Sequence, residues 1–276
     1  MADLEITSPS NPRLKAVVGL RRRRAREQAA QTVVEGFEEL GLALDAGVVP
    51  QAVFHCRELM GDPGAGAELV ERCRDLGAQV VAVGRTAFER TAYREGPDGI
   101  LALVPAIGMP VAELVVPEDS IVLVCEAIEK PGNLGAMLRT ADAAGVAAVV
   151  AADPVTDWGN PNVVRSSKGT VFSVPVASGT LKEVLAWLHS HGRRFVATTP
   201  DTDLLHTDAD LTGPIAIGVG AEKPGHTDAA LAAADVRIRI PMTGLANSLN
   251  VATSAAIVVY EAVRQRGSRD GRAGRT

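Results

Sequence analysis

Residues Ile240–Tyr260 read IPMTGLANSLNVATSAAIVVY, and they constrain the fold more than any other stretch of the chain. Directly before the loop, Val236–Ile240 has the composition of a short strand. Pro241 ends this strand, because proline cannot donate a hydrogen bond to a sheet ladder. Gly244 tolerates backbone angles that other residues disfavour, so a tight loop is expected to follow.

A helix is expected after this loop, with Asn247 or Ser248 as its N-terminal cap. Apolar residues recur there at steps of three and four, namely at Leu249, Ala252, Ala256, Val259 and Val263. Loops that leave the carboxyl ends of strands are common ligand sites in open α/β sheets, and this loop offers Ser248, Asn250 and free backbone amides. The alternative is a capped amphipathic helix that only closes the domain.

Two other stretches have a similar layout. Glu126–Ala141 reads EAIEKPGNLGAMLRTA and follows Ser120–Cys125, an apolar run typical of a buried parallel strand. Gly218–Gly225 reads GVGAEKPG and overlaps the end of the predicted strand Ile215–Val219. In order and spacing, the three stretches resemble the three motifs of the SpoU (TrmH-type) RNA ribose 2′-O-methyltransferases. The resemblance covers about residues 120–266, and the layout is also similar to antibiotic-resistance 23S rRNA methyltransferases.

The resemblance implies a parallel-sheet α/β methyltransferase domain of the SPOUT superfamily, whose last segments pass through a deep trefoil knot. It also implies a homodimer formed through this C-terminal domain. From periodicity alone, an unknotted doubly wound sheet of about six parallel strands would be expected, because chains seldom thread through themselves. Val171–Val176 is predicted to be extended.

The first hundred residues alternate between strand-like and helix-like stretches, which predicts a small α/β sandwich. Val34–Gly36 and Gly99–Ala102 resemble the ribosomal-protein-like RNA-binding domain that accompanies the methyltransferase domain in the family. Pro105–Pro117 contains three prolines and has no strong period, as in a linker. The expected organisation is an RNA substrate-binding domain at 1–106, a linker at 107–117, a knotted methyltransferase domain at 118–267 and a disordered tail at 268–276.

Composition excludes several classes of protein. The chain has 276 residues, of which 46% are hydrophobic, and this is enough for two cores. Its apolar runs are too short to span a bilayer and its start lacks a secretory pattern, so we expect a cytoplasmic protein with no membrane partner. Cys56, Cys73 and Cys125 lack C-x-x-C spacing, so neither a disulfide framework nor a metal site is expected.

The formal net charge of −5 is unlike that of a general nucleic-acid-coating protein, but the charge is unevenly distributed. Residues 1–30 hold seven basic groups against three acidic ones. The residues expected to contact RNA are Arg13, Lys15, Arg21, Arg22, Arg23, Arg24 and, from a later stretch, Arg165. For the first six, the alternative is a solvated helix start, and for Arg165 it is a structural arginine at a helix end.

The resemblance implies S-adenosyl-L-methionine as the cofactor. By the same resemblance, its pocket would be formed by Thr198, Gly218, Val219, Gly220, Ile240, Met242, Ser248 and Leu249. For the two glycines the alternative is close strand packing. A dinucleotide site fits less well, because the glycine that follows Gly220 stands at 225 and not at the three-residue step of that fingerprint.

The resemblance likewise implies a catalytic set of Asn133, Arg139, Glu222, Ser248 and Asn250. In the family, the arginine is proposed either to take the hydroxyl proton or to orient the ribose and phosphate. A guanidinium rarely deprotonates, so orientation and electrostatic stabilisation are the simpler roles. Asn133 is expected in a loop beside the same pocket as Arg139, and Glu222 is expected to pair with Arg139 or Lys223, or to lie on the surface as a free carboxylate.

Together these patterns predict an S-adenosylmethionine-dependent RNA ribose 2′-O-methyltransferase. The first candidate substrate is 23S rRNA, where the modification would serve either antibiotic resistance or a housekeeping role, and the second candidate is tRNA. The alternatives are a non-catalytic RNA-binding module of the same fold and a nucleotide-dependent oxidoreductase. Affinity for S-adenosylmethionine separates the first of these from the enzyme, and affinity for NAD would indicate the second.

Overall fold

A computed structural model describes residues 4–273, with side chains described as far as Gly267. The chain divides into two compact units: Met1–Ile107 with Asp157–Ser173, and Gly108–Thr156 with Val174–Thr276. The chain therefore passes from one unit to the other three times. The sequence predicts residues 157–173 in the second domain, whereas in the structure they pack within the first unit.

The first unit is built on a five-stranded mixed sheet with the order β1-β4-β3-β5-β2. The strands are β1 (Leu4–Ile6), β2 (Gln31–Glu35), β3 (Ala52–His55), β4 (Gln79–Val83) and β5 (Ile100–Pro105). β1, β4 and β3 run parallel, and β5 is antiparallel to both β3 and β2. Successive residues of the central strands are buried, as expected of a sheet covered on both faces.

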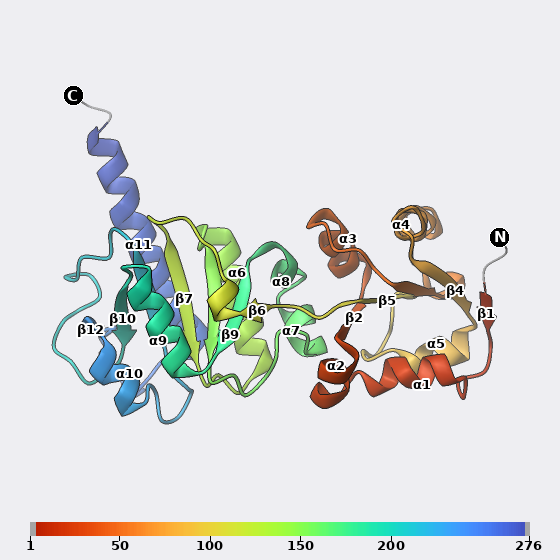
Figure 1. Ribbon diagram of the computed structural model, residues 1–276, viewed down its shortest axis with the longest axis horizontal. Coiled ribbons are helices and arrows are strands. Elements are labelled where there is room, and N and C mark those ends of the chain that lie inside the picture. The colour runs from red at the N-terminus through yellow and green to blue at the C-terminus, as the bar shows by residue number, and fades with distance from the viewer. Residues whose placement is uncertain (1–3, 274–276) are drawn as a thin grey trace. The chain divides into compact units, whose positions relative to one another are not determined.

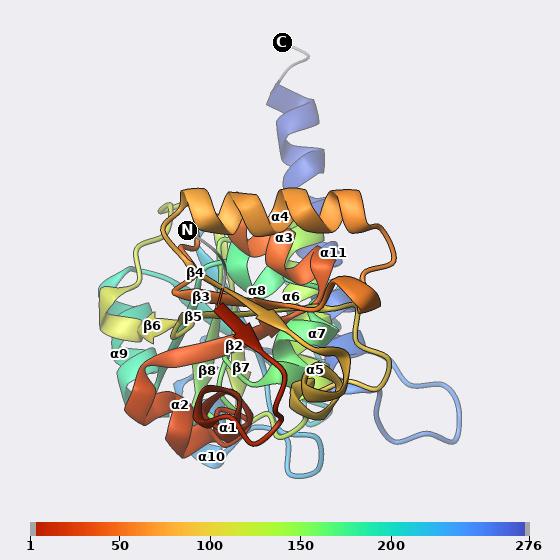
Figure 2. The same ribbon diagram turned by 90° about the vertical axis from the view of Figure 1, so that its right-hand side faces the viewer.

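Helices cover both faces of this sheet, with α3 and α4 on one face and α1, α2 and α5 on the other (Figure 1, Figure 2). They are α1 (Pro12–Gly19), α2 (Arg23–Ala29), α3 (Phe37–Asp45), α4 (Pro63–Asp75) and α5 (Arg85–Thr91), with a 3-10 turn η1 (Arg57–Leu59). The Asn11 side chain caps α1 by accepting from the Arg13 amide at 2.9 Å, and Asp62 caps α4. The small α/β fold predicted for this region is confirmed.

Residues 157–173 add two short helices to the first unit, α7 (Pro161–Ser166) and α8 (Thr170–Ser173). α7 packs against β2, and α8 packs against α3. Arg26, which is 4% exposed, donates from Nε and Nη2 to the two carboxylate oxygens of Asp157 at 3.0 and 2.5 Å. This bidentate ion pair anchors the segment, and it removes Arg26 from the basic surface to which its sequence neighbours belong.

The second unit contains a parallel seven-stranded sheet with the order β12-β10-β11-β7-β8-β9-β6. The strands are β6 (Met109–Pro110), β7 (Ile121–Glu126), β8 (Ala148–Ala152), β9 (Val176–Gly179), β10 (Arg194–Thr198), β11 (Ile215–Val219) and β12 (Val236–Ile238). Part of the expected linker thus belongs to the sheet, because β6 pairs with β9 and Val111 and Leu114 behind it are buried. The parallel α/β fold is confirmed.

Helices also cover both faces of the second sheet (Figure 1). They are α6 (Pro131–Ala144), α9 (Leu181–Ser190), α10 (Asp228–Ala233) and α11 (Val251–Ala273), with a 3-10 turn η2 (Val111–Glu113). Val122 and Val124 face the cluster under α9, whereas Cys125, next in the strand, contacts Met137 of α6. The predicted extended stretch at Val171–Val176 differs from the structure, since its first half lies in α8 and β9 begins only at Val176.

Helix α11 begins later than the sequence predicts. Its cap is Asn250, whose Oδ1 accepts from the amides of Ala252 at 2.9 Å and Thr253 at 3.3 Å, so the predicted cap at Asn247 or Ser248 is wrong. Its buried residues are Val251, Ala252, Ala255, Val258, Val259 and Ala262. The helix continues to Ala273, where a disordered tail is predicted from 268, and residues 274–276 of that tail lie outside the described residues.

The end of the chain returns from the edge of the second sheet to its middle. β12 is the edge strand beside β10, yet the next element, α11, packs against α6 and β11. A return of this kind is what the implied trefoil knot requires. The knot itself stays a prediction.

The three cysteines are buried thiols. Burial raises the pKa of Cys73 to about 11 and that of Cys125 to about 12, so both resist ionisation. Within residues 4–273, His, Cys, Asp and Glu form no cluster of three that could hold a metal ion. In the same part of the chain, no helix combines the length and apolar character needed to cross a membrane.

Candidate active site

Two of the three motif stretches leave neighbouring strands at the same edge of the second sheet. β7 and β11 pair in parallel, so the residues that follow Glu126 and Val219 emerge side by side. The third stretch follows β12, with β10 between it and β11. Because α11 returns against α6, however, the end of the third loop also reaches the first motif.

A chain of side-chain hydrogen bonds joins all three motifs. Asn133 donates from Nδ2 to Oε1 of Glu222 at 2.6 Å, and Asn250 donates from Nδ2 to Oδ1 of Asn133 at 3.1 Å. Asn250 in turn uses its Oδ1 to cap α11. In this chain of hydrogen bonds, each side-chain amide nitrogen donates and each side-chain amide oxygen accepts, which fixes the orientation of both asparagines. Three residues distant in sequence are thus held at one place.

The Glu222 carboxylate is held in its ionised form. Burial opposes ionisation, but the Glu222 backbone amide, the Asn133 side chain and the amides of Glu129 and Lys130 donate to the carboxylate, and together they lower its pKa. Its Oε2 is buried without a partner among the described residues. Glu222 therefore acts as an acceptor that binds the first motif to the second. The ion pair with Arg139 or Lys223 that the sequence predicts is not formed between these described residues.

The predicted catalytic residues divide into two groups. Asn133, Glu222 and Asn250 are brought together, whereas Ser248 is exposed in the loop before α11 and Arg139 is exposed on α6. Asn133 lies in the first turn of α6 and not in a loop. Six helical residues correspond to about 9 Å along the axis and about 120° away from the same face, so Asn133 and Arg139 do not line one wall. No hydrogen bond or ion pair of Arg139 is present among the residues described.

Gly218 and Gly220 are required by close packing. A Cβ on Gly220 would lie 2.2 Å from the backbone of Gly225 and His226, and one on Gly218 would lie 2.5 Å from the Phe195 ring. The packing alternative considered from the sequence therefore accounts for the side-chain face of both glycines. Ala221 and Gly225 form an isolated bridge, so residues 220–226 close into a small ring with Glu222 near its tip.

A second buried polar cluster lies beside this ring and was missed from the sequence. Glu126, 1% exposed, accepts from Nδ1 of His226 at 2.6 Å and from Oγ1 of Thr227 at 2.6 Å. Burial opposes ionisation of Glu126, but these hydrogen bonds outweigh it and lower the pKa. The sequence did carry a signal, since Glu126 opens the first motif and His226 directly follows the second.

Comparison with known proteins places this geometry in a family. The SpoU rRNA Methylase family matches residues 120–260, and the MRM3-like substrate binding domain matches residues 11–102. The chain belongs to the SpoU rRNA Methylase family. It is 31% identical to the 23S rRNA (uridine(2479)-2′-O)-methyltransferase of Streptomyces viridochromogenes, over 91% of this chain and 88% of that protein. It is 32% identical to the 23S rRNA (guanosine-2′-O-)-methyltransferase RlmB of Shewanella oneidensis, over 72% of this chain and 84% of that protein.

Solved structures of the family agree with the fold. A crystal structure of an RNA 2′-O ribose methyltransferase superposes with a TM-score of 0.80 and 37% identity, over 95% of this chain and 99% of that one. The AdoMet-bound rRNA methyltransferase from Sinorhizobium meliloti has a TM-score of 0.87 and 25% identity, over 94% and 97%. The SpoU methyltransferase AviRb from Streptomyces viridochromogenes, in complex with AdoMet, has a TM-score of 0.84 and 29% identity, over 94% and 100%.

The third SpoU motif lies in an open loop between β12 and α11 (Figure 2). Ile240 is half-buried, and the residues after it are exposed, among them Met242, Leu249 and Leu245, the last of which is fully exposed. The loop therefore presents apolar side chains to solvent on either side of Ser248. Thr198, at the end of β10, has a buried Oγ1 without a partner among the described residues.

In the substrate-binding unit, the predicted RNA contacts differ in how freely they can act. Arg21 donates from Nη2 to the carbonyls of Thr91 and Ala92, and its guanidinium lies 5.5 Å from the centre of the Tyr93 ring. Arg13 donates to Gln79 and Arg23 pairs with Glu27. Lys15, Arg22 and Arg24 are exposed. All six side chains are exposed, and Arg21, Arg13 and Arg23 are each held by a partner within the unit.

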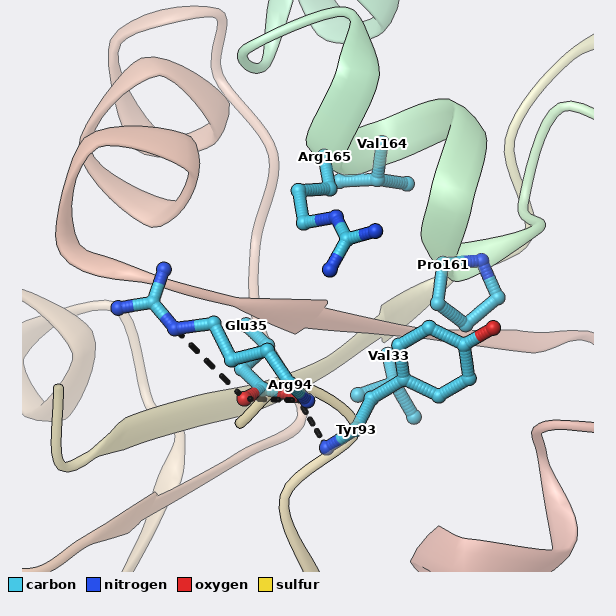
Figure 3. A pocket seen from close by; sticks show the side chains of 7 residues that line it. All are labelled: Val33, Glu35, Tyr93, Arg94, Pro161, Val164 and Arg165. Carbon is cyan, nitrogen blue, oxygen red and sulfur yellow. Dashed lines mark hydrogen bonds and ion pairs between the residues drawn. The ribbon is translucent and has the colours of Figure 1, made fainter. Parts of the chain in front are cut away.

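Arg165 borders a small hollow in the same unit (Figure 3). The hollow has a volume of about 20 Å³ and is lined by Val33, Glu35, Tyr93, Arg94, Pro161, Val164 and Arg165. Burial raises the pKa of Glu35, although the amides of Tyr93 and Arg94 donate to its carboxylate. The space is sufficient for one water molecule and too small for a nucleotide. Arg165 itself donates to Asn162 at 3.2 Å, as a helix-end arginine would.

A larger open hollow in the second unit is separate from the motifs. It has a volume of about 640 Å³ and is bordered by Ser120 and Ile121 at the start of β7, by Ala147 and by Val263 of α11. These residues mark the amino ends of the strands. The motif loops leave the carboxyl ends, so this hollow lies at the opposite edge of the sheet.

Proposed function

We propose that the protein transfers a methyl group from S-adenosylmethionine to the 2′-hydroxyl of a ribose in 23S rRNA. The observation that carries the proposal is the hydrogen-bonded chain from Glu222 through Asn133 to Asn250, because it unites the three motifs of a methylase family. The two curated relatives described above both carry names of 23S rRNA 2′-O-methyltransferases, and they support the choice of RNA.

The residues present fit the proposed cofactor. S-adenosylmethionine combines a cationic sulfonium, a flat adenine and several hydrogen-bonding groups, and when bound it supplies an electrophilic methyl group. Thr198 offers a buried hydroxyl without a partner, and Gly220 leaves backbone free of side chain at the end of β11. Ile240, Met242 and Leu249 offer exposed apolar surface that a flat ring could cover. Gly218, Val219 and Ser248 complete the proposed wall.

The protein's own part in the reaction is positioning. No side chain of the proposed site is assigned as the base, so the ribose 2′-hydroxyl would give its proton to solvent or to an RNA oxygen. Arg139 would orient the ribose and an adjacent phosphate, since its guanidinium is exposed and keeps its charge. Asn133, Glu222 and Asn250 hold the loops around the reacting atoms, and such alignment supplies much of the rate in a transfer without covalent intermediates.

The remaining parts of the proposal concern the RNA and the assembly. RNA phosphates would contact the substrate-binding unit at Lys15, Arg22, Arg23 and Arg24. Arg13 and Arg165 would lie at the edge of this RNA-contacting surface. We further propose a homodimer through the second unit, in which a partner covers the exposed loop of the third motif. An rRNA substrate would place the enzyme in the cytoplasm, and resistance to a ribosome-targeting antibiotic would be a cellular readout of the modification.

The test is to map methylation directly. Purified protein and S-adenosylmethionine are incubated in three separate reactions with unmodified 23S rRNA, 16S rRNA or tRNA. The RNA products are then hydrolysed with alkali. A 2′-O-methyl group replaces the hydroxyl proton, so the 2′ oxygen cannot ionise and attack the adjacent phosphate, and a methylated position resists hydrolysis. We expect one resistant position in 23S rRNA. Modification of tRNA alone would transfer the proposal to tRNA, and affinity for RNA without any methyl transfer would favour the binding module.

A further inference from the structure

The second-motif ring, residues 220–226, is held on the first motif at two separate points. At its tip, Glu222 accepts from Asn133 and from the amides of Glu129 and Lys130. At its base, His226 and Thr227 both bind Glu126, the last residue of β7. The tip faces the proposed catalytic residues, whereas the base lies under the strand end that carries Gly218–Gly220.

The His226 ring lies directly beneath that strand end. Its Cε1 is 3.1 Å from the place where a Cβ on Gly218 would stand, and its backbone nitrogen is 2.2 Å from the corresponding place on Gly220. On another side, the ring meets Phe195 edge-on, with centroids 6.1 Å apart and an interplanar angle of 85°. The ring therefore packs under Gly218 and the His226 backbone packs under Gly220, so the position of His226 constrains the strand end above it.

Simple core packing does not explain a histidine at this position. Its side chain is fully buried, and Nε2 has no partner among the described residues, which an apolar residue of similar size would avoid. The 2.6 Å hydrogen bond from Nδ1 to Glu126 offsets the cost of burying Nε2 without a partner and holds the imidazole in place. Thr227 shares the same carboxylate and caps α10 with its Oγ1, so Glu126 orders the backbone on both sides of the 226–227 peptide.

We propose that His226 is a positioning residue for cofactor binding: anchored by Glu126, its ring fixes the Gly218–Gly220 backbone that forms one wall for the methyl donor. The inference rests on the proposed function and adds to it a division of labour. The base of the second-motif ring, at His226, governs affinity for the cofactor, and its tip, at Glu222, governs the chemical step. His226 touches neither the RNA nor Arg139 in this assignment.

The test separates the hydrogen bond from the packing with three variants of the full-length protein. His226→Leu keeps much of the volume and removes the donor, His226→Asn keeps a donor in reach of Glu126, and Glu126→Gln keeps an acceptor without the charge. His189→Asn, on the exposed face of α9, is the matched control. Affinity for S-adenosylhomocysteine is measured by calorimetry, KM and kcat by methyl transfer, and folding by thermal unfolding without ligand.

In His226→Leu we expect at least about a tenfold loss of affinity and an equal rise in the KM for S-adenosylmethionine, with kcat at saturation within about threefold of the wild type. His226→Asn should recover most of the affinity. Unchanged affinity in His226→Leu, with only a lower melting temperature, would overturn the inference. If that variant does not fold, unchanged affinity in Glu126→Gln overturns it equally, and a loss there supports it. A wild-type protein that binds neither compound would instead overturn the proposed function.

Discussion

Substitution of Asn133 by alanine tests the junction of the three motifs. The change removes the donor to Glu222 at 2.6 Å and the acceptor for Asn250 at 3.1 Å. A hydrogen bond to a charged group contributes about 1.5–3 kcal/mol and a neutral one about 0.5–1.5 kcal/mol. Because Glu222 and Asn250 are partly accessible to water, we take the combined contribution of the two hydrogen bonds as about 2–3 kcal/mol. At about 1.4 kcal/mol per factor of ten, kcat/KM should fall about 30- to 150-fold.

The assay is methyl transfer to purified RNA below saturation, compared between Asn133→Ala and the wild type. Asn11→Ala is the matched control, since it removes a helix cap in the other unit at a cost of about 1 kcal/mol and should leave kcat/KM unchanged. Asn133→Ala combined with Glu222→Ala should cost little more than either change alone, because both remove the same interaction. If Asn133→Ala keeps kcat/KM within about threefold of the wild type, the junction does not support catalysis and the reasoning fails.

Arg139→Ala should lower kcat by at least about 100-fold and leave S-adenosylhomocysteine affinity within about twofold, because Arg139 is exposed and no described residue forms a hydrogen bond or ion pair with it. Near-normal turnover would refute its assigned role. Replacing Arg22–Arg24 by glutamine should weaken RNA binding and reduce its salt dependence by about 0.7 to 0.9 per lost phosphate contact, and an unchanged slope would show that these residues do not touch RNA. Arg26→Gln should act differently, lowering the melting temperature through loss of its buried ion pair before any RNA is added, and a variant as stable as the wild type would contradict the anchoring role. Glu126 and Glu222 have folded-state pKa values below the ordinary 4.5, so both stabilise the fold above that pH and lose this contribution as the pH falls through the lower folded values. The melting temperature should therefore fall as the pH is lowered below 4.5, more gently in Glu126→Gln than in the wild type, and equal slopes would argue against the assignment.

Most of the strands and helices could be predicted because local rules govern them. The apolar run Ser120–Cys125 before Glu126 predicted β7, whose six residues are all buried. The family could be recognised for a similar reason, since its motifs are short and contiguous. The start of α11 could not be placed, because Asn247, Ser248 and Asn250 are all good caps and only the contact with Asn133 selects the last.

Long-range pairings lay beyond the sequence. Arg26 is one of five arginines between residues 21 and 26, and nothing in that run shows that this one would turn inward to Asp157, 131 residues later. The membership of residues 157–173 in the first unit depends on the same kind of contact. Glu126 opens the first motif stretch and His226 follows the second, 100 residues later, so their contact exists only after folding.

The most direct test of the account is a crystal structure of the protein with S-adenosylhomocysteine. We expect the ligand at the carboxyl ends of β10 and β11, in contact with Thr198, Gly220 and Leu249, and with Asn133 still bonded to Glu222. A ligand bound instead in the hollow at the amino ends of β7 and β8, or a third-motif loop that stays clear of it, would contradict the claim that the three motifs form one site.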